Sequence, residues 1–453
     1  MKNNIYKSFL IVASIGLFAG CKPNLTAPSP SKGNIDVTRY VAIGNSITSG
    51  FADGALYHDG QMVSYPNLIA QQFVAIGGGD FKQPLMPGTL GCGTADSSGH
   101  TIFVAPFKLG YSIDCKLVTS LAPIPSAGSG DKNALFTSVQ GPFNNMGVPG
   151  AKVIDIATQG YGTPNVGNPF FTRMASNPAT ASILSDAMLI KPTFFSLFIG
   201  NNDVLLYATN GGASPATITS QATFSASITA LVDSLTKHGA KGVIANIPDV
   251  TVLPFFTTIP WNALTLTQSQ ADSLNIAWAD NSTTPPTPLY NFKAGNNGFL
   301  IKDPMANPFL PQRLIKEGEF VLLDVPLNSI KCNNLGSKFP IPNQYILTSY
   351  EIDSIKTAIS GYNTIIKAVA DKYNLAFVDV NAFLNQTKTG FAYDGVTFNA
   401  AFVTGGTFSL DGVHLTPVGN ALLANEFIKS INAKFGSTVN QVDVSKYHGV
   451  IFP

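Results

Sequence analysis

The stretch YVAIGNSITSG, residues 40–50, decides the fold because an apolar run stops at a glycine and small polar residues follow at once. Residues 40–43 are all apolar, which is typical of a short strand that is buried on both faces of a parallel sheet. Three further runs share this nearly continuous apolar character, and each predicts another buried strand: residues 192–199, 242–247 and 375–380.

Helical patterns lie between these predicted strands. Phe224, Ile228, Leu231 and Leu235 recur at helical spacing, and Gly239 follows them as a stop signal. Farther along the chain, a capping box formed by Thr348 and Glu351 precedes a second apolar stripe. This alternation of strands and helices predicts an α/β protein with a doubly wound parallel sheet. Ligands of such sheets bind beyond the carboxyl ends of the strands, so we expect the chemistry there.

Two long segments interrupt the alternation. Residues from about 78 to 140 are rich in Gly, Pro and Ser, and those from about 250 to 345 contain Trp261 and Trp278 with few helical signals. Loops of this length are usually functional insertions rather than passive connections. Their aromatic residues either shape an apolar acyl site or add extra core, and the sequence favours neither reading.

The composition excludes several classes of protein. Of 453 residues, 27 are Lys or Arg and 26 are Asp or Glu, so the net charge is about +1 and no basic excess is present to neutralise nucleic acid. Hydrophobic residues make up 45%, including 31 Phe and 14 Tyr, which excludes intrinsic disorder.

The N-terminus has the pattern of a secretory signal. Lys2 and Lys7 precede an uncharged run at residues 9–20, which is shorter than the roughly 20 apolar residues that span a bilayer. Residues 18–21, FAGC, resemble the lipobox of bacterial lipoproteins, with Phe18 where Leu is usual. That resemblance implies a signal peptide over residues 1–20, lipidation of Cys21, and an outer-membrane lipoprotein of the bacterial cell envelope. A plain secretory signal with an incidental cysteine is the alternative.

A flexible tether is expected to follow the signal over residues 21–36, because this stretch is rich in Pro, Ser, Gly and Thr. Three cysteines remain beyond it: Cys92, Cys115 and Cys332. An oxidising compartment permits a disulfide, and Cys92–Cys115 closes the shortest loop, which leaves Cys332 free. No C-x-x-C or paired histidines accompany these cysteines, so no zinc site or other metal site is predicted.

Two glycine-containing segments carry candidate site residues, one directly after the first predicted strand and one before Val153 and Ile154. Ser46 lies two residues beyond the first strand, where flanking glycines can present its hydroxyl on a tight turn. Taken alone, a serine at this position is more often a helix cap. The second segment is NMGVPGA, residues 145–151, which taken alone is an ordinary turn.

The third segment is GNND, residues 200–203, directly after the most apolar predicted strand. Its asparagine side chain can direct an N–H at a developing oxyanion, and Asp203 is well placed to cap the helix that follows. The similar GNNG at residues 295–298 follows no apolar strand, and we expect a plain turn there.

The fourth segment is LDGVHLTP, residues 410–417. A carboxylate three residues before a histidine can bind one ring nitrogen and leave the other free as a general base. The remaining histidines have no Asp at this spacing and are predicted to be surface or loop residues: His58, His100, His238 and His448.

In this order and at these strand ends, the four segments resemble the conserved blocks of the GDSL/SGNH hydrolase family. SYPNLIA at residues 64–70 looks like the continuation of the family's first block, and TPVGN at residues 416–420 looks like the end of its last block. Asn45 and Ile47 stand where Asp and Leu are commonest. The resemblance implies a three-layer α/β/α, flavodoxin-like sheet, with one domain over residues 37–453 rather than the three that the length alone suggests.

By position, the resemblance implies roles for individual residues. Ser46 becomes the nucleophile, His414 the general base and Asp411 its orienting partner. The oxyanion hole comprises the N–H groups of Ser46 and Gly150 and the side-chain amide of Asn202.

The expected function is therefore that of a lipid-anchored serine esterase without a cofactor, which cleaves carboxylic esters of lipids or acylated glycans. The alternatives are an acyltransferase with the same acyl-enzyme and a non-catalytic surface protein that binds glycan or lipid on the same fold. The oligomeric state is left open.

Overall fold

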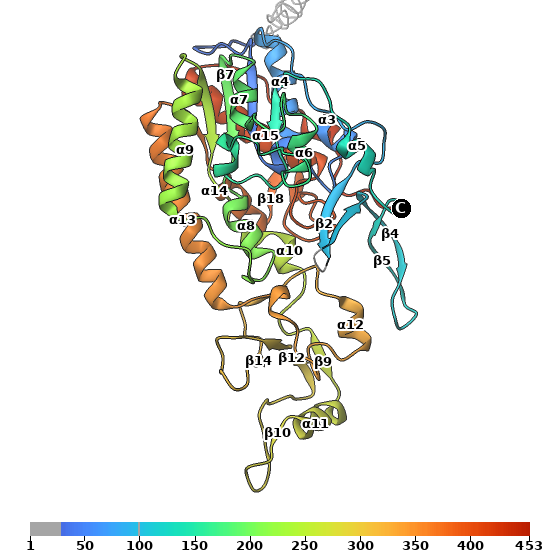
Figure 1. Ribbon diagram of the computed structural model, residues 1–453. Helices are drawn as coiled ribbons and strands as arrows, with labels where there is room; N and C mark the ends of the chain where they lie inside the picture. The colour runs from blue at the N-terminus through green and yellow to red at the C-terminus, as the bar shows by residue number, and fades with distance from the viewer. Residues whose placement is uncertain (1–28, 98–99) are drawn as a thin grey trace, which may run out of the picture.

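The computed structural model describes residues 29–97 and 100–453 (Figure 1). The predicted signal peptide and Cys21 lie outside the described residues. At the centre is a five-stranded parallel sheet in the order β17-β8-β7-β1-β6. Its strands are β1 Tyr40–Gly44, β6 Asn145–Gly147, β7 Phe194–Phe198, β8 Lys241–Ala245 and β17 Ala376–Val378.

This strand order identifies the fold class. Numbered along the chain, the five strands stand in the spatial order 2-1-3-4-5, which is that of flavodoxin-like sheets. The predicted doubly wound α/β fold is therefore confirmed, and all four predicted strands are present. The fifth strand, β6, begins the segment at residues 145–151 that was expected to be a turn. It pairs with β1 over only three residues, which is too short to leave a periodic signal.

Helices cover both faces of the sheet. On one face lie α4 (Tyr65–Phe73) and α15 (Pro417–Phe435), and on the other lie α7 (Ile183–Met188), α9 (Gln221–Thr236) and α13 (Ser349–Lys372). These three layers bury every residue of β1 and β7 and all but one residue each of β8 and β17, as the nearly continuous apolar runs predict.

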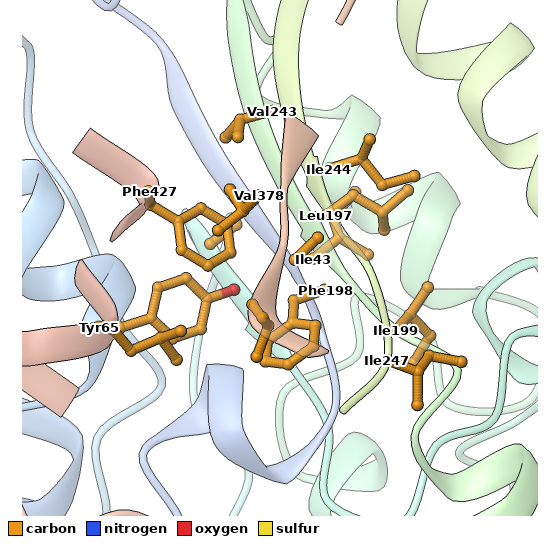
Figure 2. Close-up of a cluster of buried hydrophobic side chains, with 14 of the residues drawn as sticks. Ile43, Tyr65, Leu197, Phe198, Ile199, Val243, Ile244, Ile247, Val378 and Phe427 are labelled. Carbon is orange, nitrogen blue, oxygen red and sulfur yellow. The ribbon is translucent and has the colours of Figure 1, made fainter. Parts of the chain in front are cut away.

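The two faces of the sheet are separate apolar layers. Figure 2 shows Tyr65 of α4 and Phe427 of α15 on one side, with Leu197 and Ile244 on the other. The rings of Tyr65 and Phe427 stack with their centroids 4.7 Å apart, and Phe198 adds an edge contact to Tyr65 at 6.2 Å. Because side chains alternate across a strand, Phe198 and Leu197 face opposite layers.

The two predicted helical stripes are confirmed. All four apolar residues of the first stripe are buried in α9. Thr348 and Glu351 form the predicted capping box at the start of α13. The two helices pack against each other, where the rings of Phe224 and Tyr362 stack at 4.1 Å.

The remaining elements of the three-layer body are short: α2 Ser46–Ser49, α3 His58–Met62, α6 Pro169–Thr172, α8 Asn202–Ala208, α14 Val380–Asn385, β18 Phe391–Tyr393 and β19 Val396–Phe398. Single 3-10 turns lie at η1 Val74–Ile76, η2 Ile154–Ala157, η3 Val250–Val252, η5 Gln386–Lys388 and η6 Val444–Lys446.

The first long segment, about 78–140, contains two antiparallel hairpins and one short helix. Strand β2 (Gly93–Ser97) pairs with β3 (His100–Val104), β4 (Phe107–Ile113) pairs with β5 (Thr119–Pro125), and α5 spans Lys132–Phe136. The β4–β5 hairpin projects from the body at the right of Figure 1.

The second long segment forms what we call the insertion module, residues 254–347, which projects away from the sheet at the bottom of Figure 1. Its elements are α10 Pro254–Thr257, β9 Leu264–Leu266, α11 Gln268–Ala277, β10 Ala279–Asp280, β11 Thr287–Pro288, β12 Gly295–Asn297, β13 Leu300–Lys302, β14 Gln312–Leu314, β15 Phe320–Val321, α12 Leu327–Cys332, η4 Asn343–Tyr345 and β16 Ile346–Leu347.

The insertion module has apolar clusters of its own. Trp261 packs against a cluster that includes Phe299 and Ile341, and Trp278 packs against a second cluster that includes Leu274 and Tyr290. Both tryptophans therefore contribute to the core of the module, and of the two readings of this aromatic segment the structure supports extra core for them.

One turn prediction in this module is wrong. Residues 295–297 form strand β12, which pairs in antiparallel register with β9. The partner strand lies about 30 residues earlier, so the local pattern of glycines and asparagines contains no trace of the pairing. Asn297 is buried, and its side-chain amide donates to the carbonyls of Lys293 and Gly295.

The predicted disulfide is also wrong. Cys115 bonds to Cys332, while Cys92 is a buried free thiol. Cys115 lies just beyond β4 at the tip of its hairpin, and this tip reaches α12 of the insertion module. Beside the disulfide, Lys331 pairs with Asp114 at 2.9 Å. Loop length along the sequence favoured the wrong pair because the hairpin carries Cys115 away from Cys92.

The predicted tether, residues 21–36, extends too far toward the body. The N–H of Ser31 donates to the hydroxyl of Thr438, and the N–H of Thr438 donates to the carbonyl of Ser31. The N–H of Asn34 donates to the carbonyl of Phe435 at 3.0 Å. Ile35 is buried in the main core. The start of the described chain is therefore fixed on the end of α15. Across residues 29–97 and 100–453, no helix is both long enough and apolar enough to cross a membrane.

Candidate active site

Ser46 is held on a tight turn between β1 and the short helix α2. Asn45 caps this helix, because its side-chain oxygen accepts from the N–H of Ile47 at 3.2 Å. A Cβ at Gly44 would lie 2.5 Å from the carbonyl oxygen of Phe198, so only glycine fits where the strand ends. The turn presents the Ser46 hydroxyl at the carboxyl edge of the sheet, next to the point where the strand order reverses.

The structure brings Ser46, His414 and Asp411 into one hydrogen-bonded chain. The Oγ of Ser46 lies 2.8 Å from Nε2 of His414, and Nδ1 of His414 lies 2.8 Å from Oδ2 of Asp411. A carboxylate can only accept, so Nδ1 carries the proton and Nε2 is left to accept from the serine hydroxyl. This is the arrangement of a nucleophile, a base and an orienting carboxylate.

Asp411 is fixed by several donors besides His414. Its Oδ2 accepts from the N–H of Gly54, and its Oδ1 accepts from the N–H groups of Val413 and His414 and from the hydroxyl of Ser409. Burial by itself would raise the pKa of Asp411, but the interaction with His414 and the backbone N–H donors hold it well below its usual range. Asp411 is therefore a permanent anion at neutral pH.

A second carboxylate, Asp53, supports the loop that carries Asp411, and sequence reasoning missed it. Its carboxylate accepts from the N–H of Leu410 at 2.9 Å and from the hydroxyl of Tyr57 at 2.8 Å, and its own N–H donates to Ser409. Burial, together with the nearby charge of Asp411, raises the pKa of Asp53. Its backbone lies in the left-handed region, with φ of 54°. No motif marks it, because Ser409 and Leu410, its partners in the loop of Asp411, lie more than 350 residues away.

An aromatic pair covers one side of the histidine. The ring of Phe51 lies 4.8 Å from that of His414, and Phe170 makes an edge contact with Phe51 at 6.1 Å. The side chain of His414 is 13% exposed, so it is shielded but still open to solvent. These contacts restrict the imidazole to the orientation that reaches Ser46.

The proposed oxyanion donors share the same edge of the sheet as Ser46. In register, Gly44 of β1 faces Gly147 of β6 and Phe198 of β7, so the residues that follow these three positions emerge together. Gly150 follows β6 and has φ of 82°, and Asn202 follows β7. The backbone N–H groups of Ser46 and Gly150 have no hydrogen-bond acceptor among the described residues.

Two bonds fasten the loop after β6 to helix α8. The side-chain amide of Asn202 donates to the carbonyl of Ala151 at 3.0 Å, which leaves its second N–H free for another acceptor. Oδ2 of Asp203 accepts from the N–H of Val153 at 2.9 Å. Asp203 therefore does not cap α8 as predicted. It lies inside the first turn and ties α8 to the loop that contains Gly150.

The other histidines lie away from this chain. His58 pairs with the exposed Asp59 at 2.9 Å, and His238 and His448 are exposed, so these three are surface residues as predicted. The side chain of His100 lies outside the described residues. Within the part of the chain that the structure describes, no group of three or more His, Cys, Asp or Glu residues is arranged to hold a metal ion.

No protein-family model matches the sequence, and no curated protein does. Solved structures with a similar arrangement include a lipase/acylhydrolase from Enterococcus faecalis, at 13% identity over 89% of this chain and 98% of that one, with a TM-score of 0.32. A mutant of an acetylxylan esterase from Geobacillus stearothermophilus is 11% identical over 86% and 93% of the two chains, with a TM-score of 0.36. A putative GDSL-like lipase from Parabacteroides merdae is 11% identical over 89% and 99%, also with a TM-score of 0.36. These similarities are distant, so the fold rests on the strand order of this chain and the site on its own hydrogen bonds.

Proposed function

We propose that this protein is a serine esterase that cleaves carboxylic esters through an acyl-enzyme on Ser46. The observation that carries the proposal is the unbroken hydrogen-bonded chain from Asp411 through His414 to Ser46 at the carboxyl edge of the sheet. Ser46 and His414 are 368 residues apart in the sequence, and a merely structural role would not require that these three groups meet in this order.

In the acylation step, Oγ of Ser46 attacks the ester carbonyl carbon while its proton passes to Nε2 of His414. The bond from that carbon to the alkoxy oxygen then breaks, and His414 returns the proton to the departing alcohol. In deacylation, water attacks the acyl carbon and gives a proton to His414. Ser46 leaves as the new acid forms and takes that proton back, so the enzyme returns to its initial state.

The tetrahedral intermediates of both steps carry a negative oxygen. The N–H groups of Ser46 and Gly150 and the free amide N–H of Asn202 are the donors that we assign to it. Each such donor contributes on the order of 3 kcal/mol to transition-state stabilisation in other hydrolases. The bond from Asn202 to Ala151 supports this assignment because it orients the amide toward the loop that contains Gly150.

We further propose that the substrate is a lipid ester or an acylated glycan and that Cys21 anchors the enzyme to the outer membrane of a bacterial envelope. The lipobox resemblance supports the anchor. Incorporation of a radiolabelled fatty acid into the full chain, and its loss in Cys21→Ser, tests this part separately from catalysis.

The central test is turnover of p-nitrophenyl esters of increasing acyl length by the parent protein and by Ser46→Ala. We expect the variant to lose on the order of 10⁴-fold or more in kcat, because the nucleophile acts as a unit with its base. Ser273→Ala, an exposed serine on α11, is the matched control and should keep the parental rate.

The outcomes separate the alternatives. Parental activity in Ser46→Ala would show that the nucleophile is assigned wrongly, and an inactive parent protein would favour the binding-protein alternative. Transfer of the acyl group to added alcohols in preference to water would identify an acyltransferase that uses the same acyl-enzyme.

A further inference from the structure

A basic groove lies at the end of the sheet opposite to Ser46. It has a volume of about 810 Å³ and lies among the residues that precede three parallel strands. Arg39 directly precedes β1, Lys191 lies shortly before β7, and Lys241 is the first residue of β8. Parallel strands begin at one edge of a sheet and end at the other, so this amino edge is separated from Ser46 by at least the length of β1, about 16 Å.

The groove is strongly positive in a protein whose net charge is about +1. Lys32, Arg39, Lys191 and Lys241 line it together with His238, and the only carboxylate in the lining is Asp36. Among the described residues, none of the four permanent cations forms an ion pair with a carboxylate. A cluster in which four permanent cations face a single carboxylate attracts anions.

Backbone contacts hold two of these cations in place. The Nε of Arg39 donates to the carbonyl of Lys191 at 2.6 Å, which leaves the outer guanidinium nitrogens available. Nζ of Lys241 donates to the carbonyl and to the side-chain oxygen of Asn34, so it also fixes the start of the described chain at this groove. Lys32 and Lys191 are exposed.

The first described residues lie beside this groove and are a short length of chain away from the proposed anchor at Cys21. Ser31 and Asn34 are fixed beside it, and Cys21 precedes the first described residue by eight positions. Eight residues span at most about 28 Å when fully extended. An acylated Cys21 therefore keeps the groove close to the bilayer that holds the acyl chains.

We propose that this amino-edge groove docks on the phosphate groups of anionic lipid headgroups in the membrane that holds the anchor. The inference rests on the proposed function only through the lipidation of Cys21. Lysine and arginine side chains near an anionic bilayer each strengthen binding by about fivefold, so four cations supply a substantial second contact beside the acyl chains.

The docked orientation determines from which side an ester substrate can reach Ser46. With the amino edge on the membrane, the carboxyl edge and Ser46 face away from it. An ester that approaches from the aqueous side, such as an acylated glycan, then reaches the nucleophile more readily than an ester within the same bilayer.

The test uses the full chain with Cys21→Ser, so that no acyl group contributes to membrane binding. Co-sedimentation is measured with vesicles of phosphatidylcholine alone and with vesicles that contain 30% phosphatidylglycerol. The ratio of the two affinities cancels any contribution of residues 1–28 to neutral membranes. This ratio is compared between the parent and the double variant Lys32→Glu/Lys191→Glu. The side chains of Lys32 and Lys191 have no hydrogen-bond partner among the described residues, so the variant removes positive charge without breaking a side-chain hydrogen bond.

We expect the double variant to lose at least about 25-fold of the preference for anionic vesicles, which is fivefold for each lost cation. Lys302→Glu/Lys338→Glu makes the same charge change on exposed residues of the insertion module and should keep the parental ratio. Thermal unfolding of all three proteins verifies that they are folded, and this check does not depend on esterase activity.

Three results would overturn the proposal. The first is a parent protein without preference for anionic vesicles, and the second is an equal loss in the module control. The third is displacement from the vesicles by 10 mM inorganic phosphate at constant ionic strength, which would identify a site for free phosphate instead. Because no step of this test involves ester cleavage, its failure is distinguishable from failure of the esterase proposal.

Discussion

At the scale of single residues, Asp411 sets the proton position on which the proposed mechanism depends. Replacing it with Asn should reduce kcat by about 10⁴-fold, because the amide donates to Nδ1 and leaves the proton on Nε2. The pKa of Asp411 is held well below its usual range, so at pH 8 the carboxylate is ionised and keeps the proton on Nδ1 of His414. Steady-state kinetics on p-nitrophenyl acetate at pH 8 measures the loss, and a parental kcat in the variant would contradict this role of Asp411.

The residues of the site differ in how far the sequence reveals them. Asp411 and His414 lie three positions apart, and Asn202 follows a strongly apolar strand, so short local patterns pointed to them and the order of the four segments selected them. Asp53 has no such pattern because it supports Leu410 from the other end of the chain. Asp203 was found, but its role was wrong, since its partner Val153 lies 50 residues away.

Asp203 also gives a prediction about stability and pH. Burial raises its pKa to about 6 from the ordinary 3.8, so the folded protein binds this proton more tightly than the unfolded chain. Its stabilising contribution is complete below about pH 4 and is lost as the pH rises through 6. Asp203→Asn keeps an acceptor for Val153 and carries no charge. We expect it to be more stable than the parent at pH 8, by at most about 3 kcal/mol, with a smaller difference at pH 5.

Urea denaturation at the two pH values measures this difference in the free energy of unfolding. Asp80→Asn is the control, because Asp80 is exposed and forms no ion pair among the described residues, and it should show no such pH dependence. A variant that is less stable than the parent at pH 8 would mean that the charge of Asp203 is compensated within the fold.

At the scale of elements, the sequence was informative wherever an element is long or uniformly apolar. Strands β1, β7, β8 and β17 and helices α9 and α13 satisfy that condition, because complete burial requires apolar residues at regular positions. Strands β6 and β12 have three residues each, and both depend on partners distant in the sequence. Short strands of this kind are stabilised by the neighbours that the fold supplies, so their own residues need not show a pattern.

The disulfide joins two elements that no local signal relates, the β4–β5 hairpin and helix α12. It closes a loop of 217 residues, and cross-links over long loops contribute most to stability. We expect Cys115→Ser/Cys332→Ser to lower the free energy of unfolding by about 2–5 kcal/mol. It should also increase amide hydrogen exchange in residues 107–125 and 327–332, as measured by mass spectrometry.

The free cysteine provides the control for this prediction. Cys92 is buried, with a pKa that burial raises to about 11, and it contacts neither end of the bridge. Cys92→Ala should leave hydrogen exchange at the hairpin tip unchanged. Unchanged exchange in the double variant as well would mean that Lys331 and Asp114 hold the two elements together without the bond.

At the scale of the whole molecule, the insertion module has two apolar clusters of its own beside the main core of the three-layer body. The main core joins the sheet to its covering helices and includes Phe256, Leu322 and Leu347 where the module meets the body, whereas the two other clusters contain only residues 259–346. This separation explains how the motifs of one fold extend from Gly44 to Asn420 in a chain three times the usual domain length. The added length forms structure of its own and leaves the sheet order intact.

Because the module has apolar clusters of its own, we expect a Leu→Ala change in the module and one in the body to affect stability and hydrogen exchange in different parts of the protein. Leu231 in α9 belongs to the main core and Leu274 in α11 to the module, and both are buried. Removing a buried leucine side chain costs about 2–5 kcal/mol, and the cost falls on the unit that contains it. Leu231→Ala should therefore lower the free energy of unfolding of the whole protein. Leu274→Ala should accelerate hydrogen exchange only within residues 264–300, and it should leave turnover of p-nitrophenyl acetate unchanged. If Leu274→Ala instead accelerates exchange in the strands of the central sheet, the module and the body unfold as one cooperative unit, and the substrate site of the body depends on the module for its stability.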